Sequence, residues 1–287
     1  MVMKFYITGL FVFLMFMGSS AQQKVIIKLW PGAVPGETEA KHEPVVTDNK
    51  SGNVTRITDI TDPAMIVFPA STDNNNGAGV VVCPGGGYSI LAIDKEGYEI
   101  AEWLNKLGFT AAVLQYRVPK KQEGALQDVQ RAIRIMRSKA SKWNLNPDKL
   151  GVMGFSAGGS LSARASTLYD EKIYPKVDEK DDLSCKPDFA LLIYPAYLDQ
   201  GENRSLTPEL KVNKNTPPTF IFQAADDRLA NSSLVYASAL RDADVPVELH
   251  LVPKGGHGFG MRPGNEAAET WPGLAEKWLK KVITLLN

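Results

Sequence analysis

Short apolar segments alternate with longer amphipathic segments from residue 79 almost to the C-terminus. The short segments are rich in β-branched residues and carry few polar ones, which is typical of strands covered on both faces. Between them, apolar residues such as Trp103, Leu104 and Leu107 recur at helical spacing, as in helices that pack one face on a core. This pattern predicts strands over 79–83, 110–115, 150–155, 189–194, 219–223 and 247–252, and helices over 94–107, 124–141, 157–169, 231–243 and 269–286.

Strict alternation of strand and helix predicts an α/β fold with a mostly parallel central sheet and helices on both faces. Residues 54–68 precede this alternation and are interpreted as an antiparallel lead-in to the sheet. Residues 170–187 and 200–216 are polar and irregular, which predicts surface loops and at most a small lid over a site. Because the chain has no internal repeat and no low-complexity linker, we predict a single domain over residues 22–287.

The first 21 residues differ from the rest of the chain. Lys4 precedes an apolar run over residues 10–17, and small residues follow at 18–21. This order is typical of a secretory signal peptide that is removed from the mature protein. A membrane anchor is the less favoured alternative, because the apolar run is near the short limit for crossing a bilayer. We therefore expect a secreted or periplasmic protein with no stable membrane insertion after cleavage.

The charge balance is neutral, with 32 lysine and arginine residues against 32 aspartate and glutamate residues. Such a balance gives no long-range field toward nucleic acid, so we expect no nucleic-acid partner. The two cysteines, Cys83 and Cys185, can pair in an oxidising compartment. Cys83 ends a predicted buried strand, where a free thiol packs well, and this favours two unpaired cysteines.

The strongest chemical signal is Ser156, in the segment Gly154-Phe155-Ser156-Ala157-Gly158 that follows a predicted strand and precedes a predicted helix. Glycines two positions before and after a serine permit a tight strand-to-helix turn that exposes the hydroxyl at the carboxyl edge of the sheet. The helix that follows directs its positive end to the same place. Ser156 is therefore the candidate nucleophile.

A serine hydroxyl needs a base, and the chain has three histidines. His42 precedes the sheet, and His250 lies inside the last predicted strand, where a structural role is favoured. His257 follows that strand in a glycine-rich loop that can reach Ser156. We therefore predict that His257 is the general base.

The third member of the predicted triad is an acid that orients the imidazole. Asp226 and Asp227 both follow the strand over 219–223. The order Ser156, Asp227, His257 is that of the α/β-hydrolase fold. We favour Asp227, and Asp226 remains an open alternative.

Three consecutive glycines follow the first predicted parallel strand in Pro84-Gly85-Gly86-Gly87-Tyr88. Their backbone N–H groups are unshielded, which suits them to stabilise an oxyanion. We predict that Gly86, Gly87 and Ala157 supply these donors. The related lipase motif begins with histidine where this chain has Pro84, so this loop must be held differently. The chain has no His-Glu-x-x-His pattern and no cysteine–histidine cluster, so we expect no metal and no cofactor.

Together these motifs resemble a group of secreted α/β-hydrolases described as acetylxylan esterases or feruloyl-esterase-like carbohydrate esterases. The resemblance implies a small acyl ester of a carbohydrate as substrate, above all an acetyl ester of a xylan-type polysaccharide or oligosaccharide. Two other functions stay open: a secreted serine peptidase of the prolyl-oligopeptidase type, and a hydrolase-fold binding protein without catalysis. Gln127, Asp128 and Arg131 are interpreted as structural residues that form local pairs on one helix. The stretches that carry the resemblance are Leu29 to Gly32, Pro84 to Tyr88, Glu96-Gly97, Tyr116 to Val118, Gln127-Asp128, Arg131-Ala132, Gly154 to Gly159, Pro187 to Phe189, Tyr194-Pro195 and Gly255 to Gly260.

Overall fold

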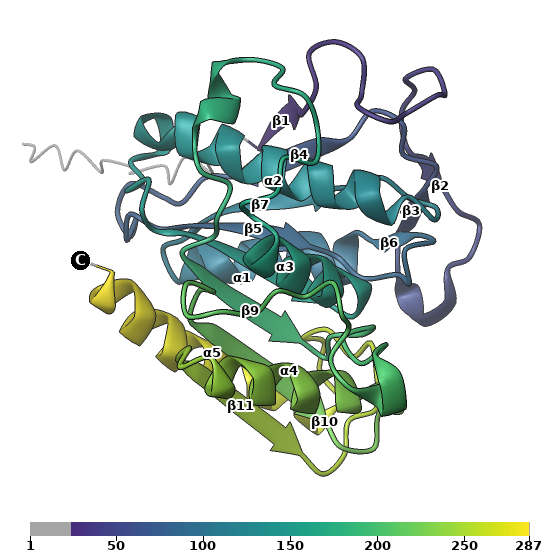
Figure 1. Ribbon diagram of the computed structural model, residues 1–287, viewed down its shortest axis with the longest axis vertical. Coiled ribbons are helices and arrows are strands. Elements are labelled where there is room, and N and C mark those ends of the chain that lie inside the picture. Colours follow the sequence, from purple (N-terminus) through teal and green to yellow (C-terminus); the bar gives the residue numbers. More distant parts are fainter. Residues whose placement is uncertain (1–23, 287) are drawn as a thin grey trace, which may run out of the picture.

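The computed structural model describes residues 24–286, and its centre is an eight-stranded, mostly parallel sheet (Figure 1). The strand order is β1-β4-β7-β5-β8-β9-β10-β11, and only the β1–β4 and β4–β7 pairs are antiparallel. The strands are β1 (Val25–Lys28), β4 (Ala64–Phe68), β5 (Gly79–Cys83), β7 (Thr110–Gln115), β8 (Leu150–Phe155), β9 (Phe189–Ile193), β10 (Thr219–Ala224) and β11 (Val247–Val252).

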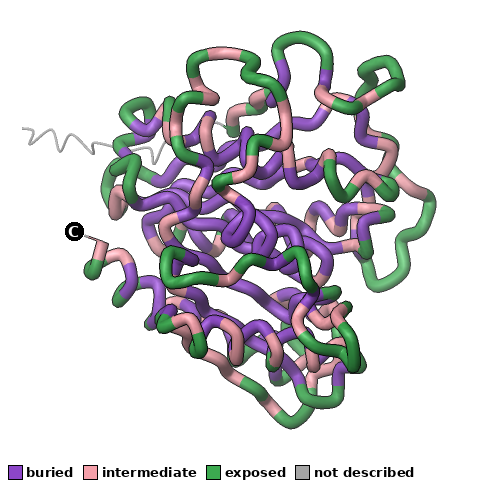
Figure 2. The backbone as a smooth tube through the Cα atoms, viewed as in Figure 1, coloured by how far each residue is buried: buried purple, intermediate pink, exposed green. Residues whose placement is uncertain are grey.

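Helices cover both faces of this sheet, as the alternating pattern predicts. The helices α2 (Gln122–Ser138), α3 (Ala157–Thr167) and α4 (Asn231–Asp242) lie in front of the sheet in the view of Figure 1. The helices α1 (Glu99–Lys106) and α5 (Glu266–Leu285) lie on the opposite face, where the rings of Trp103 and Trp271 are 5.2 Å apart. Figure 2 shows the result: the central strands of the sheet and much of the helices are buried, whereas the edge strands β1 and β11 are not, and many connecting loops are exposed.

Short elements complete the chain. One π-helical turn, η2 (Asp94–Tyr98), leads directly into α1. Short 3₁₀ helices occur at η1 (Ser51–Asn53), η3 (Ala140–Trp143), η4 (Glu179–Asp182) and η5 (Glu202–Arg204). A small antiparallel sheet is formed by β2 (Val45–Val46), β3 (Arg56–Thr58) and β6 (Leu91–Ala92).

The predicted lead-in over residues 54–68 is partly wrong. Its second half forms β4 in the main sheet, but its first half forms β3 in the separate small sheet. The strand β1 was not predicted, because its four residues alternate between exposed and half-buried positions at the edge of the sheet. The other predicted strands are found within one residue of their expected ends, and the main helical segments within a few residues.

Asp128 and Arg131 are structural residues, as predicted, but they do not use the local pairs that their spacing on one helix permits. Both lie on α2 and are buried, but their partners come from other segments. Asp128 accepts hydrogen bonds from the Trp30 indole at 2.9 Å and from the Arg117 guanidinium at 2.9 Å. Arg131 donates to Asp178 at 2.6 Å, so it fixes the loop over residues 170–187 to the helix. These residues tie distant segments together.

The next predictions concern the two cysteines, the signal peptide and membrane insertion. Cys83 and Cys185 are both buried free thiols, and burial raises the pKa of Cys83 to about 12. The predicted signal peptide, residues 1–21, lies outside the described residues. Within residues 24–286, no helix combines the length and the apolar character that crossing a bilayer requires.

Candidate active site

Ser156 sits in a strained turn between β8 and α3. Its backbone has φ 53° and ψ −119°, a region that L-residues rarely adopt. The turn is tight: a Cβ atom at Gly154 would lie 2.0 Å from the carbonyl oxygen of Gly158, and one at Gly158 would lie 2.0 Å from that of Cys83. Only glycine fits at both positions, so this sequence holds the Ser156 hydroxyl above the carboxyl end of β8.

The structure brings Ser156, His257 and Asp227 into one hydrogen-bonded chain. The Oγ atom of Ser156 is 2.7 Å from Nε2 of His257, and Nδ1 of His257 is 2.6 Å from Oδ2 of Asp227. Asp227 follows β10 and His257 follows β11, so parallel strands deliver all three residues to one edge of the sheet. The side chain of Asp227 is 1% exposed, and it also accepts hydrogen bonds from Gln223 and from the Leu229 N–H. Its orientation toward the imidazole is therefore fixed on several sides.

The other candidates for base and acid lie elsewhere. Asp226 is exposed and accepts a hydrogen bond from the Gly256 N–H at 2.8 Å, so it supports the histidine loop without contacting the imidazole. Nε2 of His250 is 2.8 Å from Oε1 of Glu248 on the same strand, as expected for a structural residue. His42 lies on the N-terminal segment, with Nδ1 2.9 Å from the Glu43 carbonyl oxygen.

The glycine loop after β5 lies beside Ser156, and two of its backbone N–H groups are free for a ligand. Gly85 donates its N–H to the Glu96 carboxylate at 2.8 Å. No hydrogen bond within residues 24–286 uses the N–H of Gly86 or Gly87, and both residues line the same cavity as Ser156. Ala157 is the first residue of α3, so its N–H has no partner within the helix. Gly86 and Gly87 thus share a cavity with Ser156 and Ala157 follows it in the chain, and their role as oxyanion donors stays a prediction.

The first two residues of the glycine loop, Pro84 and Gly85, are held by hydrogen bonds to their carbonyl oxygens. The Tyr116 hydroxyl donates to the Pro84 carbonyl oxygen at 2.6 Å, and the Ala92 N–H donates to the Gly85 carbonyl oxygen at 3.0 Å. Burial raises the pKa of Tyr116 well above its usual value, so the phenol remains a neutral donor. Both contacts hold the beginning of the loop, directly before Gly86 and Gly87.

Sequence reasoning missed a buried pair behind the site, Glu96 and Tyr194. One carboxylate oxygen of Glu96 accepts from Gly85, and the other accepts from the Tyr194 hydroxyl at 2.9 Å. The Tyr194 hydroxyl in turn accepts from the Gly260 N–H at 2.9 Å. Both oxygens of Glu96 act as acceptors, which fits the ionised form. Burial raises the pKa of Glu96, and the hydrogen bonds from Tyr194 and Gly85 oppose that rise.

This pair connects the glycine loop to the loop that carries His257. Glu96 lies in η2, and Tyr194 follows β9 and packs edge-on against the His257 ring with centroids 5.1 Å apart. Glu96 follows Asp94 and Lys95 in a charged segment, so its local sequence does not mark it as a buried residue. Its partner is 98 positions away in the sequence, so no local pattern identifies it.

A cavity of about 460 Å³ opens over the serine. Its size lies in the range of small-molecule sites. Ser156, His257, Gly86 and Gly87 line it together with Tyr197 and three basic side chains, Arg56, Lys95 and Arg228. A larger cavity of about 660 Å³ lies between α2 and the loop over residues 171–176, and no residue of the serine–histidine–aspartate chain lines it.

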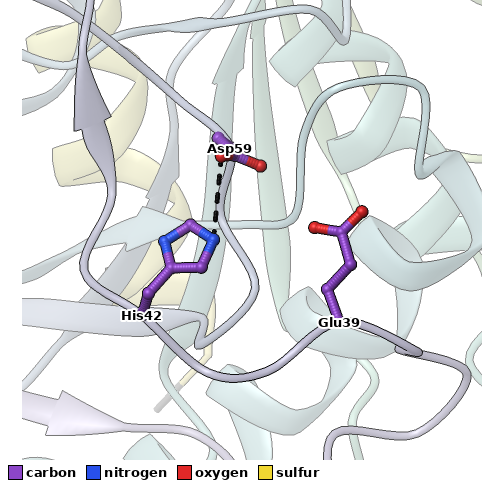
Figure 3. A group of neighbouring side chains, drawn as sticks. All are labelled: Glu39, His42 and Asp59. Carbon is purple, nitrogen blue, oxygen red and sulfur yellow. Dashed lines mark ion pairs between the residues drawn. The ribbon is translucent and has the colours of Figure 1, made fainter.

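Figure 3 shows a surface group in which Glu39, His42 and Asp59 place possible metal-ligand atoms within 4.8 Å of one another. The group already makes other contacts. Nε2 of His42 is 3.7 Å from the Asp59 carboxylate, and the Lys121 ammonium is 3.9 Å from Glu39. Glu39 and His42 are exposed and Asp59 is half-buried, so water competes for every ligand position. We assign no metal to this group.

Comparison with known proteins agrees with this architecture, and the chain belongs to the alpha/beta hydrolase family. Residues 65–193 match the family model BD-FAE, and residues 197–261 match the model of the alpha/beta hydrolase fold. A solved structure of an acetyl ester-xyloside bifunctional hydrolase from Caldicellulosiruptor lactoaceticus is 30% identical and superposes with a TM-score of 0.74. That match covers 90% of this chain and 96% of the other.

Two curated relatives are enzymes of xylan breakdown by name. An acetylxylan esterase of Xylanibacter ruminicola is 35% identical over 215 residues, which are 66% of this chain and 42% of the relative. An endo-1,4-beta-xylanase B of Butyrivibrio fibrisolvens is 31% identical over 220 residues, which are 68% of this chain and 34% of the relative. The chain thus matches less than half the length of each of these relatives.

Proposed function

We propose that the protein is a serine carboxylic-ester hydrolase that removes acetyl groups from xylan-type carbohydrate. The observation that carries this proposal is the hydrogen-bonded chain from Ser156 through His257 to Asp227 on the wall of an open cavity. The proposal that the substrate is a carbohydrate ester is supported by the similarity of the chain to an acetylxylan esterase and to an acetyl ester-xyloside hydrolase.

In the proposed reaction, Nε2 of His257 takes the proton of the Ser156 hydroxyl while Oγ attacks the ester carbonyl carbon. The negative charge that develops on the carbonyl oxygen is stabilised by the N–H groups of Gly86, Gly87 and Ala157. Asp227 holds the imidazole by its Nδ1–H and stabilises the imidazolium. The histidine then gives its proton to the sugar oxygen, and the carbon–oxygen bond of the ester breaks.

The second half of the reaction releases the acid. His257 takes a proton from water, and the resulting hydroxide attacks the acyl-enzyme carbonyl carbon. The same backbone donors stabilise the second tetrahedral intermediate. The bond to Ser156 Oγ then breaks, the histidine returns its proton to the serine, and acetate leaves.

In this proposal Glu96 and Tyr194 are positioning residues. They join the backbone at Gly85, next to the proposed oxyanion donors, to the backbone at Gly260, close to His257. The ionised carboxylate also adds a negative charge near the imidazolium that forms during turnover. Their proposed role is to hold the two halves of the site at a fixed separation.

We also propose that this chemistry takes place outside the cytoplasm, after removal of residues 1–21. The support is the basic start, the apolar run over residues 10–17 and the small residues that follow. Amino-terminal sequencing of the protein recovered from the producing cells tests this point. A mature protein that begins at residue 22 is the expected result, and a retained leader would contradict it.

The experiment that tests the function is acetate release from acetylated xylan by the mature protein, with Ser156→Ala as the control. We expect release by the native protein and none by the variant, with matched thermal unfolding. Cleavage of p-nitrophenyl acetate without release from xylan would retain the serine mechanism and reject the carbohydrate substrate. Cleavage of proline-containing peptides instead would favour a peptidase, and inactivity in every assay would favour a binding protein.

A further inference from the structure

The cavity over Ser156 has a local charge that the whole chain does not have. Three basic side chains line it, Arg56 from β3, Lys95 from η2 and Arg228 from the turn after Asp227. The chain itself has equal numbers of basic and acidic residues. Three separate segments therefore converge to place positive charge at the site of the proposed reaction.

One acidic side chain, Glu96, lines the cavity together with these three basic groups. Within residues 24–286, none of the three forms an ion pair with a carboxylate. Arg56 donates to the backbone carbonyl oxygens of Asn49 and Val54. Lys95 donates to the Gly258 carbonyl oxygen at 2.7 Å, which leaves two of its three N–H bonds available. Arg228 is exposed.

The nearby carboxylates are already engaged. Glu96 is buried and accepts hydrogen bonds on both of its oxygens. Asp94 and Glu99 pair with Arg262 at 3.3 Å and 2.6 Å. Asp226 accepts from the Gly256 N–H. Among the side chains that line the cavity itself, three are basic and one, Glu96, is acidic, so the lining carries an excess of positive charge.

We propose that this cavity selects an acylated sugar that also carries a carboxylate group, as a uronic-acid substituent near the ester would. Guanidinium groups bind carboxylates with paired, charge-assisted hydrogen bonds, and a site with several basic groups suits such a ligand. The three basic groups line the same cavity as Ser156, so the carboxylate must lie on the acylated sugar or on one close to it.

This inference deepens the proposed function and rests on it. It differs from long-range steering, because a chain with no net charge attracts an acidic polymer only through local contacts. The preference must therefore arise inside the cavity and must depend on individual basic residues there.

The test compares two acetylated xylo-oligosaccharides that differ only in one glucuronic acid side group beside the acetylated residue. We expect kcat/KM to be roughly five to ten times higher for the acidic substrate at low salt, in line with one charge-assisted contact at a partly exposed site. Salt at about 0.5 M should reduce this ratio toward one, because it screens exposed charges. A ratio of one in the native protein at low salt would overturn the proposal.

Two variants locate the effect. In Arg228→Gln the ratio of kcat/KM for the acidic substrate to that for the neutral substrate should fall to about two or less. Arg56→Gln is an independent second variant in which the same ratio should fall. The matched control is Arg241→Gln, an exposed arginine of α4 that pairs with Asp242 and does not line the cavity, and its ratio should remain that of the native protein. Thermal unfolding of each variant verifies the fold. Persistence of the native ratio in both Arg228→Gln and Arg56→Gln would contradict the proposal.

A third substrate separates this inference from the proposed function. If p-nitrophenyl acetate is cleaved but neither oligosaccharide is, the carbohydrate function fails, and the acidic preference fails with it. If both oligosaccharides are cleaved at equal rates, the proposed function stands and only the acidic preference is lost.

Discussion

The hydroxyl of Tyr194 donates a hydrogen bond to the buried carboxylate of Glu96 at 2.9 Å. Glu96 lies under the glycine loop after β5, and Tyr194 lies beside the loop after β11. Transition-state stabilisation and proton transfer need groups held at a fixed separation, because small displacements are costly in rate. The Glu96–Tyr194 contact thus joins the two loops on which the proposed reaction depends.

Glu96→Gln should lower kcat about tenfold to hundredfold with a smaller change in KM. An amide cannot accept hydrogen bonds at both positions, so one buried donor loses its partner at a cost of about 1–3 kcal/mol. Loss of the nearby negative charge also destabilises the imidazolium. The acid limb of the kcat/KM profile should therefore move to lower pH, which steady-state kinetics between about pH 4 and pH 8 would measure. If kcat falls but the acid limb of the kcat/KM profile does not move, the role of Glu96 is purely structural.

Tyr194→Phe distinguishes the effect of the hydrogen-bonded link between the two loops from the effect of the Glu96 charge. This variant keeps the Glu96 carboxylate but removes the link to Gly260, so kcat should fall while the acid limb stays in place. Tyr236→Phe is the matched control, because the buried Tyr236 hydroxyl has no hydrogen-bond partner within residues 24–286. That control should retain native kinetics. Equal losses in the two phenylalanine variants would mean that the hydroxyl of Tyr194 has no special role.

Asp227→Asn should lower kcat by roughly 10³- to 10⁴-fold, because an amide donates to Nδ1 and favours the wrong imidazole tautomer. Asp226→Asn should cost less than about tenfold, since within residues 24–286 its carboxylate hydrogen-bonds only to the Gly256 N–H, and an amide oxygen can also accept that bond. The two variants differ by one position in the same turn, so each is the control for the other. Turnover of p-nitrophenyl acetate measures both. A larger loss in Asp226→Asn would move the acid one residue earlier.

The fold and the serine–histidine pair were predictable from sequence because their signals are local. The Gly154–Gly158 segment forms its turn by short-range sterics, and His257 was the histidine placed after the last strand. The choice between Asp226 and Asp227 was harder, because both follow the same strand and only the directions of their side chains differ. The structure resolves that direction through the contacts of Asp227 with Gln223 and Leu229.

The contacts that could not be predicted from sequence are long-range ones. Arg131 has charged neighbours on its own helix, yet its partners are Asp178 and Asp181 in a loop about 50 positions away. Glu96 and Tyr194 are 98 positions apart. Periodicity identifies the face of a helix that is buried, but it does not identify which distant carboxylate or hydroxyl meets that face. Tertiary packing makes that selection.

Gly86→Ala should disturb the glycine loop far more than Gly87→Ala. A Cβ atom at Gly86 would lie 2.1 Å from the Ile90 carbonyl oxygen, and the backbone there has φ 138°. At Gly87, with φ 64°, the nearest atom is the Tyr197 hydroxyl at 3.6 Å, so alanine carries mainly a left-handed backbone cost of about 1–2 kcal/mol. If the loop supplies oxyanion donors, kcat in Gly86→Ala should fall about 10²- to 10³-fold.

Affinity for a transition-state analogue, such as a boronic acid, provides the second readout for these glycine variants. Its dissociation constant should rise in parallel with the loss of kcat in Gly86→Ala and change little in Gly87→Ala. Full activity in a folded Gly86→Ala protein would show that the oxyanion is stabilised elsewhere.

The last prediction concerns pH and the loop over residues 170–187. Arg131 is almost fully buried and donates two hydrogen bonds to the Asp178 carboxylate, at 2.6 Å and 2.9 Å. These hydrogen bonds hold the pKa of Asp178 well below its ordinary value of 3.8. A carboxyl whose pKa is lower in the folded state than in the unfolded state stabilises the fold at pH values above its unfolded-state pKa. That contribution is lost as the pH falls toward the folded-state pKa.

Asp178→Asn should therefore lower the free energy of unfolding at pH 7 by about 1–2 kcal/mol, as expected when a charge-assisted contact to a buried guanidinium is weakened. The difference from the native protein should shrink below about pH 4, because Asp178 of the unfolded native chain takes up a proton there while the folded-state carboxyl stays ionised. Urea unfolding at pH 7, 5 and 3 measures both effects. Asp182→Asn is the control: Asp182 pairs with the exposed Lys176 and should have little effect at any pH. A destabilisation by Asp178→Asn that is equal at pH 7 and pH 3 would show that shape, rather than charge, fixes this loop to α2.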